Sequence, residues 1–343
     1  MLDTLKRLPD PVGMKKQDIV DMLLKEEYGY LPERPYSVTA IERAEQKFCM
    51  GKAVLDRIVL NCKASWGEFS FPLYYAYPKN KTNVPCFIHI NFRDLVPDRY
   101  QPTEELIDLG YATLTFCYKD ITSDSGDFTD GLAGVVYPDG ARKDTDCGKI
   151  GLWAWAAMAV MDFAQTLPEL DKNRISVAGH SRLGKTALLA GALDERFYCA
   201  FSNDSGNSGA ALARDSDQET IAMITKQFPF WFCENYKKYA NREDEMPFDQ
   251  HWLIAANVPH KVYVASAVDD PWACPKNENM ACIAGSEYYK SYGMKGFVSP
   301  NRLAEVGECF HEGDIGYHLR AWGHFFSRED WLKYVEFLEL KFK

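Results

Sequence analysis

The strongest constraint on this chain is an alternation of apolar, strand-like runs with helical segments that begins at residue 84. The strand-like runs are VPCFIHINF (84–92), ATLTFCY (112–118), RISVAG (174–179), FYCAFSND (197–204), KVYVASAV (261–268) and GDIGYHLRAW (313–322). Segments with helical character lie between or after them, at 103–110, 152–167, 186–193 and 327–340. Strands that alternate with helices predict an α/β fold with a mostly parallel, doubly wound sheet. Ligands of such folds bind at the carboxyl ends of the strands.

Two further parts complete the expected organisation. A helix at 15–30 precedes three β-rich stretches at 36–48, 53–64 and 69–78, so residues 1–80 are predicted to form a helix and an antiparallel β arm. The stretch between the strand-like runs that end at 204 and begin at 261 is longer than one crossover needs. We expect residues 205–258 to form a helical insertion over the carboxyl edge of the sheet, within a single domain spanning 1–343.

Composition excludes several classes of function. The net charge of -10 disfavours nucleic acid and anionic membranes as partners, because the mean field of the protein would repel both. The first residues, MLDTLKRLPDPVGMKKQ, include no apolar run of signal-peptide length, and no later segment is apolar for long enough to span a bilayer, which predicts a cytoplasmic protein. The ten cysteines are scattered without a C-x-x-C pair and favour buried, reduced thiols. The seven histidines form no H-x-x-x-H or H-E-x-x-H motif, so neither a metal nor another cofactor is expected. The oligomeric state is left open.

The stretch GHSRLGKT, residues 179–186, satisfies two incompatible motifs. As G-x-x-x-x-G-K-[ST] it is a P-loop that would bind nucleotide phosphates, with the acidic end of KVYVASAVDD as a partner for magnesium. As a strand, a turn and a helix with Ser181 at the apex, it is a nucleophile elbow. The elbow is favoured, since several strands precede the loop and the bulky Arg182 and Leu183 occupy its middle.

The elbow interpretation also explains the far end of the chain. A serine hydroxyl needs a nearby base, usually a histidine that is held by a carboxylate. In hydrolases of this architecture the order is serine, acid and then a late histidine. His324 lies in RAWGHF, between the last predicted strand and the last predicted helix, and acids at strand ends lie between it and Ser181.

Structural alternatives exist for each candidate residue. Ser181 is a possible helix N-cap, and His324 is a possible cap of the terminal helix. Arg182 has the alternative of pairing with a surface acid, and Lys185 that of a solvated helix residue. Trp231 and Trp272 are alternatively core residues.

The motif residues resemble those of a known family, the glucuronoyl esterases, which cleave esters between lignin alcohols and the glucuronic acid side groups of xylan. GHSRLGKTAL resembles the family's G-C-S-R-x-G-K-G-A elbow. Four further segments match consecutive signatures of bacterial members, namely FPFWFCENY, MPFDQHWLIAA, VDDPWACP and YHLRAWGHFFSREDW. The similarity covers approximately the last 170 residues, with INF at 90–92 as a fainter upstream match. Three positions depart from the family pattern: His180 replaces a cysteine, Asp204 a glutamate and Cys274 an aspartate.

The resemblance implies an α/β-hydrolase fold and assigns roles by position. Ser181 would be the nucleophile, His324 the general base and Arg182 an oxyanion donor. The substrate would be contacted by Lys185, Trp272, Glu219 and Trp231. The triad acid is either Asp270 in DDPW or Asp204 in NDSG, with Asp269 as a third possibility.

The expected activity is therefore hydrolysis of a small carbohydrate ester by a serine carboxylic ester hydrolase. Glucuronoyl and acetyl esters of xylan-type oligosaccharides are both open, because relatives of this type are often labelled acetyl xylan esterases. The alternatives are a hydrolase-fold protein that binds carbohydrate without turnover and, less favoured, a P-loop nucleotide hydrolase.

Overall fold

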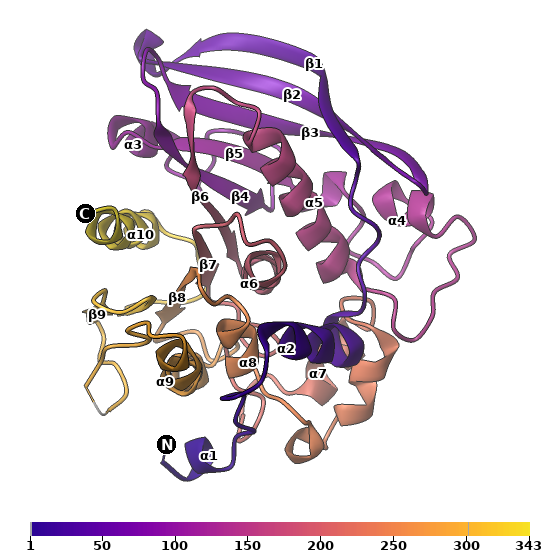
Figure 1. Ribbon diagram of the computed structural model, residues 1–343, viewed down its shortest axis with the longest axis vertical. Coiled ribbons are helices and arrows are strands. Elements are labelled where there is room, and N and C mark those ends of the chain that lie inside the picture. The colour runs from indigo at the N-terminus through magenta and orange to yellow at the C-terminus, as the bar shows by residue number, and fades with distance from the viewer. Residues whose placement is uncertain (1, 301) are drawn as a thin grey trace.

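The computed structural model describes residues 2–300 and 302–343 as one ten-stranded sheet with helices on both faces (Figure 1). The strand order is β1-β2-β3-β5-β4-β6-β7-β8-β10-β9. The strands are β1 (Ser37–Phe48), β2 (Ala53–Ala64), β3 (Gly67–Pro78), β4 (Val84–Asn91), β5 (Ala112–Cys117), β6 (Leu170–His180), β7 (Cys199–Asn203), β8 (Lys261–Ala267), β9 (Cys309–Phe310) and β10 (Ile315–Arg320). Six neighbouring strands of the sheet pair in parallel, in the order β5-β4-β6-β7-β8-β10. The predicted α/β fold with a mostly parallel sheet is therefore confirmed.

The helices and helical turns cover both faces of the sheet. They are α1 (Leu2–Lys6), α2 (Lys16–Leu23), η1 (Leu24–Tyr28), η2 (Cys49–Gly51), α3 (Thr103–Asp108), η3 (Tyr118–Asp120), α4 (Gly131–Val136), α5 (Lys149–Ala164), α6 (Arg182–Leu193), α7 (Ile221–Gln227), η4 (Glu234–Tyr239), η5 (Glu243–Glu245), α8 (His251–Ala255), α9 (Pro275–Ser291) and α10 (Arg328–Lys341). One face of the sheet packs against α5, α6 and α9, and the other against α3 and α10 (Figure 1). The parallel strands are therefore buried on both sides.

The N-terminal β arm is an extension of this sheet. Strands β1, β2 and β3 pair antiparallel with one another, and β3 joins β5 through Tyr74–Thr115, Tyr75–Leu114 and Ala76–Thr113. The alternating burial of β3 fits this position, because one of its faces packs on the core while the other remains more accessible.

The sequence patterns did not predict helix α9 (Pro275–Ser291). Its interior is rich in polar residues that are nevertheless buried, among them Asn277 and Glu278, so the apolar spacing of an amphipathic helix is absent. Pro275 at its first turn fits a helix start, since the missing N–H has no intrahelical partner there. Helix α5 is buried on nearly all sides, which explains its strongly apolar composition.

The segment 205–258 crosses from β7 to β8 and contains α7, η4, η5 and α8. It is tied to the N-terminal residues by Arg7, which pairs with Asp215 and Asp244. No described helix combines the length and the apolar character needed to cross a membrane.

Candidate active site

Ser181 lies at a sharp turn between β6 and α6. Its φ is 57° and its ψ -129°, a conformation that is uncommon for a residue with a side chain. The turn is held by its backbone N–H, which donates to the Asn203 carbonyl at 2.8 Å. A Cβ at Gly179 would lie 2.1 Å from the Leu183 carbonyl oxygen, so the turn requires glycine there. Ser181 occupies the N-cap position of α6, but its side chain makes no capping hydrogen bond and so is not engaged by the helix.

Lys185 is held by oxygen atoms of the protein. It is 2 % exposed, and its Nζ donates to the carbonyls of Ser205 (2.5 Å) and Asn207, with Glu219 Oε2 at 3.5 Å. Burial lowers the pKa of Lys185, and the Glu219 carboxylate opposes this shift. The alternative of a solvated helix residue is therefore wrong. A phosphate-binding lysine needs free donors, so the P-loop alternative is not favoured either.

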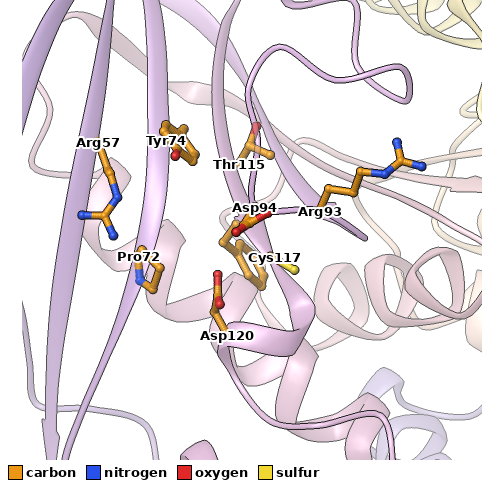
Figure 2. Close-up of a pocket in the computed structure, with 9 residues that line it drawn as sticks. Arg57, Pro72, Tyr74, Arg93, Asp94, Thr115, Cys117 and Asp120 are labelled. Carbon is orange, nitrogen blue, oxygen red and sulfur yellow. The ribbon is translucent and has the colours of Figure 1, made fainter.

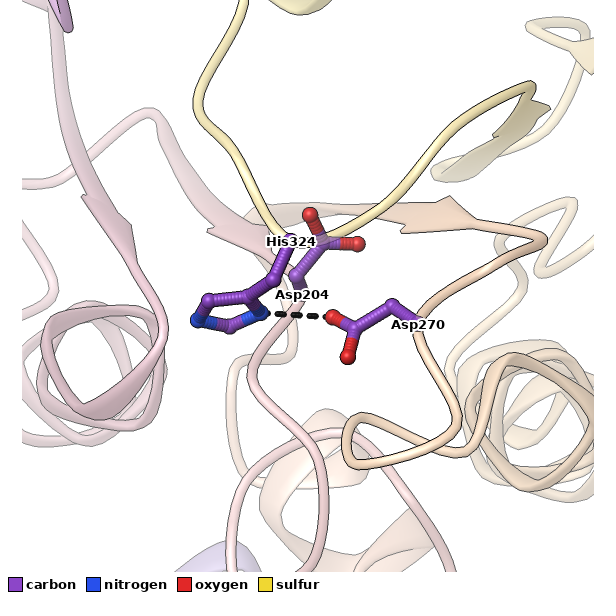
Figure 3. A group of neighbouring side chains, drawn as sticks. All are labelled: Asp204, Asp270 and His324. Carbon is purple, nitrogen blue, oxygen red and sulfur yellow. Dashed lines mark hydrogen bonds and ion pairs between the residues drawn. The ribbon is translucent and has the colours of Figure 1, made fainter.

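His324 and Asp270 form a hydrogen-bonded pair (Figure 3). The His324 Nδ1 lies 2.6 Å from Asp270 Oδ2, with the carboxylate buried and the imidazole partly exposed. His324 does not cap the terminal helix, because Ser327 does so through a capping box with Asp330. This arrangement leaves Nε2 of the imidazole as the ring nitrogen available for proton transfer.

Asp204 lies close to this pair but bonds elsewhere. Asp204, Asp270 and His324 each have one oxygen or ring nitrogen atom within 4.8 Å of those of the other two residues (Figure 3). Asp204 Oδ2, however, accepts from Arg320 Nη2 at 2.8 Å. Within the described residues, the buried Oδ1 of Asp204 has no hydrogen-bond partner. Asp269, the third candidate, is exposed.

Arg182 is positioned by Asp124, a residue that sequence analysis did not identify. The Arg182 Nη1 pairs with Asp124 Oδ2, while Asp124 Oδ1 accepts from Trp231 Nε1 at 2.8 Å. The guanidinium lies 4.6 Å from the centre of the Trp231 ring, which stacks on Phe228. Within residues 2–300 and 302–343, the buried Nε of Arg182 has no hydrogen-bond partner. Arg182 is thus fixed in place by Asp124 and the Trp231 ring.

His180 occupies the position before the nucleophile and packs against His324, with ring centroids 4.3 Å apart. Burial, and secondarily the neighbouring His324, lower the pKa of His180 to about 3. Its Nδ1 lies 2.6 Å from Asn203 Oδ1. His180 is therefore neutral near neutral pH and adds no second positive charge beside His324.

A pocket of about 270 Å³ brings most of the sequence-predicted site residues together. Its lining comprises Ser181, Arg182, Lys185, Asp204, Ser205, Glu219, Gln227, Phe228, Trp231, Trp272, Ala273 and His324. Trp231 is 3 % exposed and forms part of the wall, whereas Trp272 is 41 % exposed. Asp270 is absent from the lining, since it supports His324 from behind.

A second polar hollow, of about 160 Å³, lies beside β3 and β5 (Figure 2). Its lining includes Arg57, Asp94 and Asp120. Burial raises the pKa of Asp120. This hollow has neither Ser181 nor His324 on its walls, so the elbow pocket is the candidate active site.

The fold and the elbow define the class of the protein, an α/β-hydrolase that presents a serine at the carboxyl edge of its sheet. Residues 60–293 match the family model described as "Glucuronyl esterase, fungi", which is more than half of the chain. The chain therefore belongs to the glucuronoyl esterase family and is a carboxylic ester hydrolase.

Individual relatives agree with this assignment. "Carbohydrate esterase MZ0003", from an unknown prokaryotic organism, is 30% identical and the alignment covers 97% of this chain and 89% of that protein. The "4-O-methyl-glucuronoyl methylesterase" of Thermothelomyces thermophilus is 28% identical over 92% of this chain and 77% of its own length. The solved structure of a glucuronoyl esterase from Solibacter usitatus superposes with a TM-score of 0.87 at 28% identity, covering 97% of this chain and 93% of that one.

Proposed function

We propose that this chain hydrolyses glucuronoyl esters of xylan-type oligosaccharides through Ser181, His324 and Asp270. The observation that carries the proposal is the shared pocket. A serine in a strained elbow and a histidine paired with a buried carboxylate line one hollow together with an ion-paired Lys185–Glu219 and an exposed Trp272. Relatives named as 4-O-methyl-glucuronoyl methylesterases support the choice of the acyl group.

The size and lining of the pocket favour a sugar on the acyl side of the ester. An acetyl group fills only a small part of about 270 Å³. Charged and amide side chains around the pocket suit the hydroxyl groups of a uronate ring, and an exposed tryptophan suits its apolar face. Acetyl esters of the same carbohydrates remain the competing substrates, and a cytoplasmic location remains a prediction.

The chemistry follows from the positions of the side chains. His324 Nε2 removes the proton of the Ser181 hydroxyl as Oγ attacks the ester carbonyl, while Asp270 keeps Nδ1 protonated and stabilises the imidazolium. The backbone of the elbow and the free Nε of Arg182 stabilise the oxyanion. His324 then protonates the leaving alcohol, and water attacks the acyl-enzyme with the same histidine as base.

A substrate panel tests this proposal. Purified protein is assayed on benzyl glucuronate, acetylated xylo-oligosaccharides and an aryl acetate, together with Ser181→Ala and, as a matched control, Ser65→Ala in the exposed β2–β3 turn. We expect the highest kcat/KM on the glucuronate ester and a loss of at least about 1000-fold in Ser181→Ala, because removal of a serine nucleophile leaves only binding and oxyanion stabilisation. Full activity of Ser181→Ala would contradict the proposed role of Ser181 as the nucleophile. A higher kcat/KM on acetyl esters would show that the acyl group is acetyl and not glucuronoyl.

A further inference from the structure

Arg320, the last residue of β10, is a buried guanidinium at the base of the loop that carries His324. It is 5 % exposed. Each of its five N–H donors has an acceptor. Nε donates to Asp330 Oδ1 (3.0 Å), Nη1 to the carbonyls of Ala321 (3.1 Å) and Gly323 (3.0 Å), and Nη2 to Asp204 Oδ2 (2.8 Å) and the carbonyl of Phe325. The planar fork is therefore fully used, which fixes its orientation.

The loop of residues 321–325 curls around this guanidinium. Three of its carbonyls, at alternate residues on either side of His324, point at one cation. Trp322 has a φ of 70°, which is a strained value for a bulky residue and is sustained by the surrounding contacts. One of these contacts is the backbone N–H of Asp269, which donates to the Trp322 carbonyl at 3.1 Å. The loop is thereby joined to the segment that carries Asp270.

The same guanidinium holds Asp204. This carboxylate is 1 % exposed, and one of its oxygen atoms lies within 4.8 Å of a ring nitrogen of His324. Burial raises the pKa of Asp204, and the positive charge of Arg320 is the main influence that lowers it. With Arg320 in place, Asp204 bonds the guanidinium, and Asp270 bonds the imidazole.

We propose that Arg320 is a positioning residue with two linked effects: it fixes the His324 loop, and it holds Asp204 away from His324 so that Asp270 alone orients the imidazole. The inference rests on the proposed role of His324 as the general base. In this inference, Arg320 at the end of β10 determines which of the two aspartates, Asp204 after β7 or Asp270 after β8, bonds His324.

Lysine cannot replace Arg320 in this role. An ammonium group has three donors and no fixed fork, whereas this site presents five acceptors arranged around a plane. Arg320→Lys keeps the charge and therefore separates the geometric effect from the loss of a cation. Displacement of a catalytic group by about 1 Å costs on the order of 100-fold in rate.

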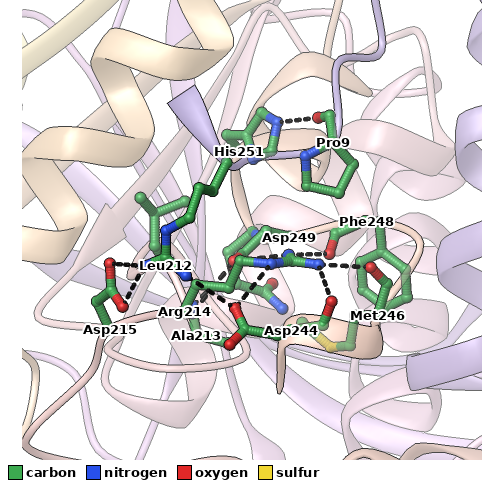
Figure 4. A network of polar contacts seen from close by, with 12 residues as sticks. Pro9, Leu212, Ala213, Arg214, Asp215, Asp244, Met246, Phe248, Asp249 and His251 are labelled. Atoms are coloured by element: carbon green, nitrogen blue, oxygen red, sulfur yellow. Dashed lines mark hydrogen bonds and ion pairs between the residues drawn. The ribbon is translucent and has the colours of Figure 1, made fainter. Parts of the chain in front are cut away.

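Arg214 supplies a matched control (Figure 4). It is likewise buried, at 3 % exposed, and donates to the carbonyls of Met246 (2.5 Å) and Phe248 (2.7 Å) and to Asp249 Oδ2 (3.1 Å). It does not line the elbow pocket. Arg214→Lys thus removes a comparable set of buried hydrogen bonds without touching the His324 loop.

The test measures kcat, KM and the thermal midpoint of the full chain for Arg320→Lys, Arg214→Lys and Arg320→Lys/Asp204→Asn. For Arg320→Lys we expect kcat on the preferred ester to fall about 100-fold with KM within about 3-fold. For Arg214→Lys we expect kcat within about 3-fold of the wild type, even at a similar loss of thermal stability. The added Asp204→Asn change should restore at least about 5-fold of the lost kcat, because a neutral amide competes less well for the imidazole N–H.

Two outcomes would overturn the inference. One is Arg320→Lys with a wild-type kcat, or with a fall in kcat no larger than that of Arg214→Lys. The other is a double variant as slow as Arg320→Lys or slower, which would show that Asp204 does not compete for His324. If Ser181→Ala is inactive in the same assays, either outcome overturns only the role of Arg320, whereas an active Ser181→Ala overturns the proposed function itself.

Discussion

The segments that follow β7 and β8 each present an aspartate beside His324, and they differ in what the carboxylate contacts. Asp204 follows β7 directly, is 1 % exposed and bonds Arg320. Asp270 lies three residues beyond β8, is 2 % exposed and bonds His324. Burial is nearly equal, so it does not distinguish the two acids. The neighbouring cation distinguishes them, because the Asp204 carboxylate accepts a hydrogen bond from the Arg320 guanidinium, whereas Asp270 bonds His324.

Glu278 of α9 anchors both segments from below. Its Oε1 accepts from the backbone N–H groups of Ser205 (2.9 Å) and Gly206 (3.0 Å), just after Asp204. Its Oε2 accepts from the hydroxyl of Ser266 in β8 at 2.6 Å. The carboxylate of Glu278 therefore holds both acid-bearing segments. The two segments differ in the partner of their aspartate, which is Arg320 for Asp204 and His324 for Asp270.

The largest expected effect comes from Asp270→Asn. An amide cannot stabilise the imidazolium and favours the wrong tautomer of His324, so kcat on the preferred ester should fall about 1000- to 10,000-fold. KM should change little, because Asp270 does not line the pocket. The exposed neighbour Asp269 provides the matched control, and Asp269→Asn should stay within about 3-fold of the wild type. Steady-state kinetics of the two variants decide the point, and a fall below 10-fold for Asp270→Asn would remove Asp270 from the triad.

A smaller effect is expected on stability from Glu278→Gln. Burial raises the pKa of Glu278 to about 7, so the folded protein keeps this proton at pH values where the unfolded chain has lost it. The contribution of Glu278 to stability therefore decreases as the pH rises from the ordinary glutamate range through about 7. Glutamine does not titrate. From pH 5.5 to pH 7.5, the free energy of unfolding of the variant should therefore rise by about 2 kcal/mol relative to that of the wild type.

Urea unfolding of both proteins at the two pH values measures this difference. The glutamine side chain of the Glu278→Gln variant would keep an amide oxygen for the two N–H groups, and the Ser266 hydroxyl can turn to accept from the new NH₂ group. The fold should therefore persist. A constant difference in unfolding free energy across this pH range would contradict a raised pKa for Glu278.

The sequence predicted the succession of parallel strands along the chain because their apolar runs are long and bounded by helical segments, whereas the two-residue strand β9 was not predicted. It also selected Ser181 and His324, since an elbow and a late histidine are local patterns. The triad acid stayed ambiguous because each candidate follows a strand. Arg320 and Asp124 were missed for a related reason: the contact of Arg320 with Asp204 and that of Asp124 with Trp231 span 116 and 107 residues of the chain. A role that depends on such distant partners leaves no local pattern.

The smallest effect is expected from Asp204→Asn, and it is the sharpest test of the comparison between the two acids. Asparagine retains a carbonyl oxygen that can accept from Arg320 Nη2, so the His324 loop should keep its shape. Its neutral side chain also carries no desolvation penalty for a buried charge. We expect kcat to fall less than about 10-fold, at least about 100-fold less than in Asp270→Asn, when both are assayed on the same ester. If Asp204→Asn were instead as slow as Asp270→Asn, the imidazole would depend on both carboxylates, and the hydrogen bond between His324 and Asp270 would no longer identify the triad acid.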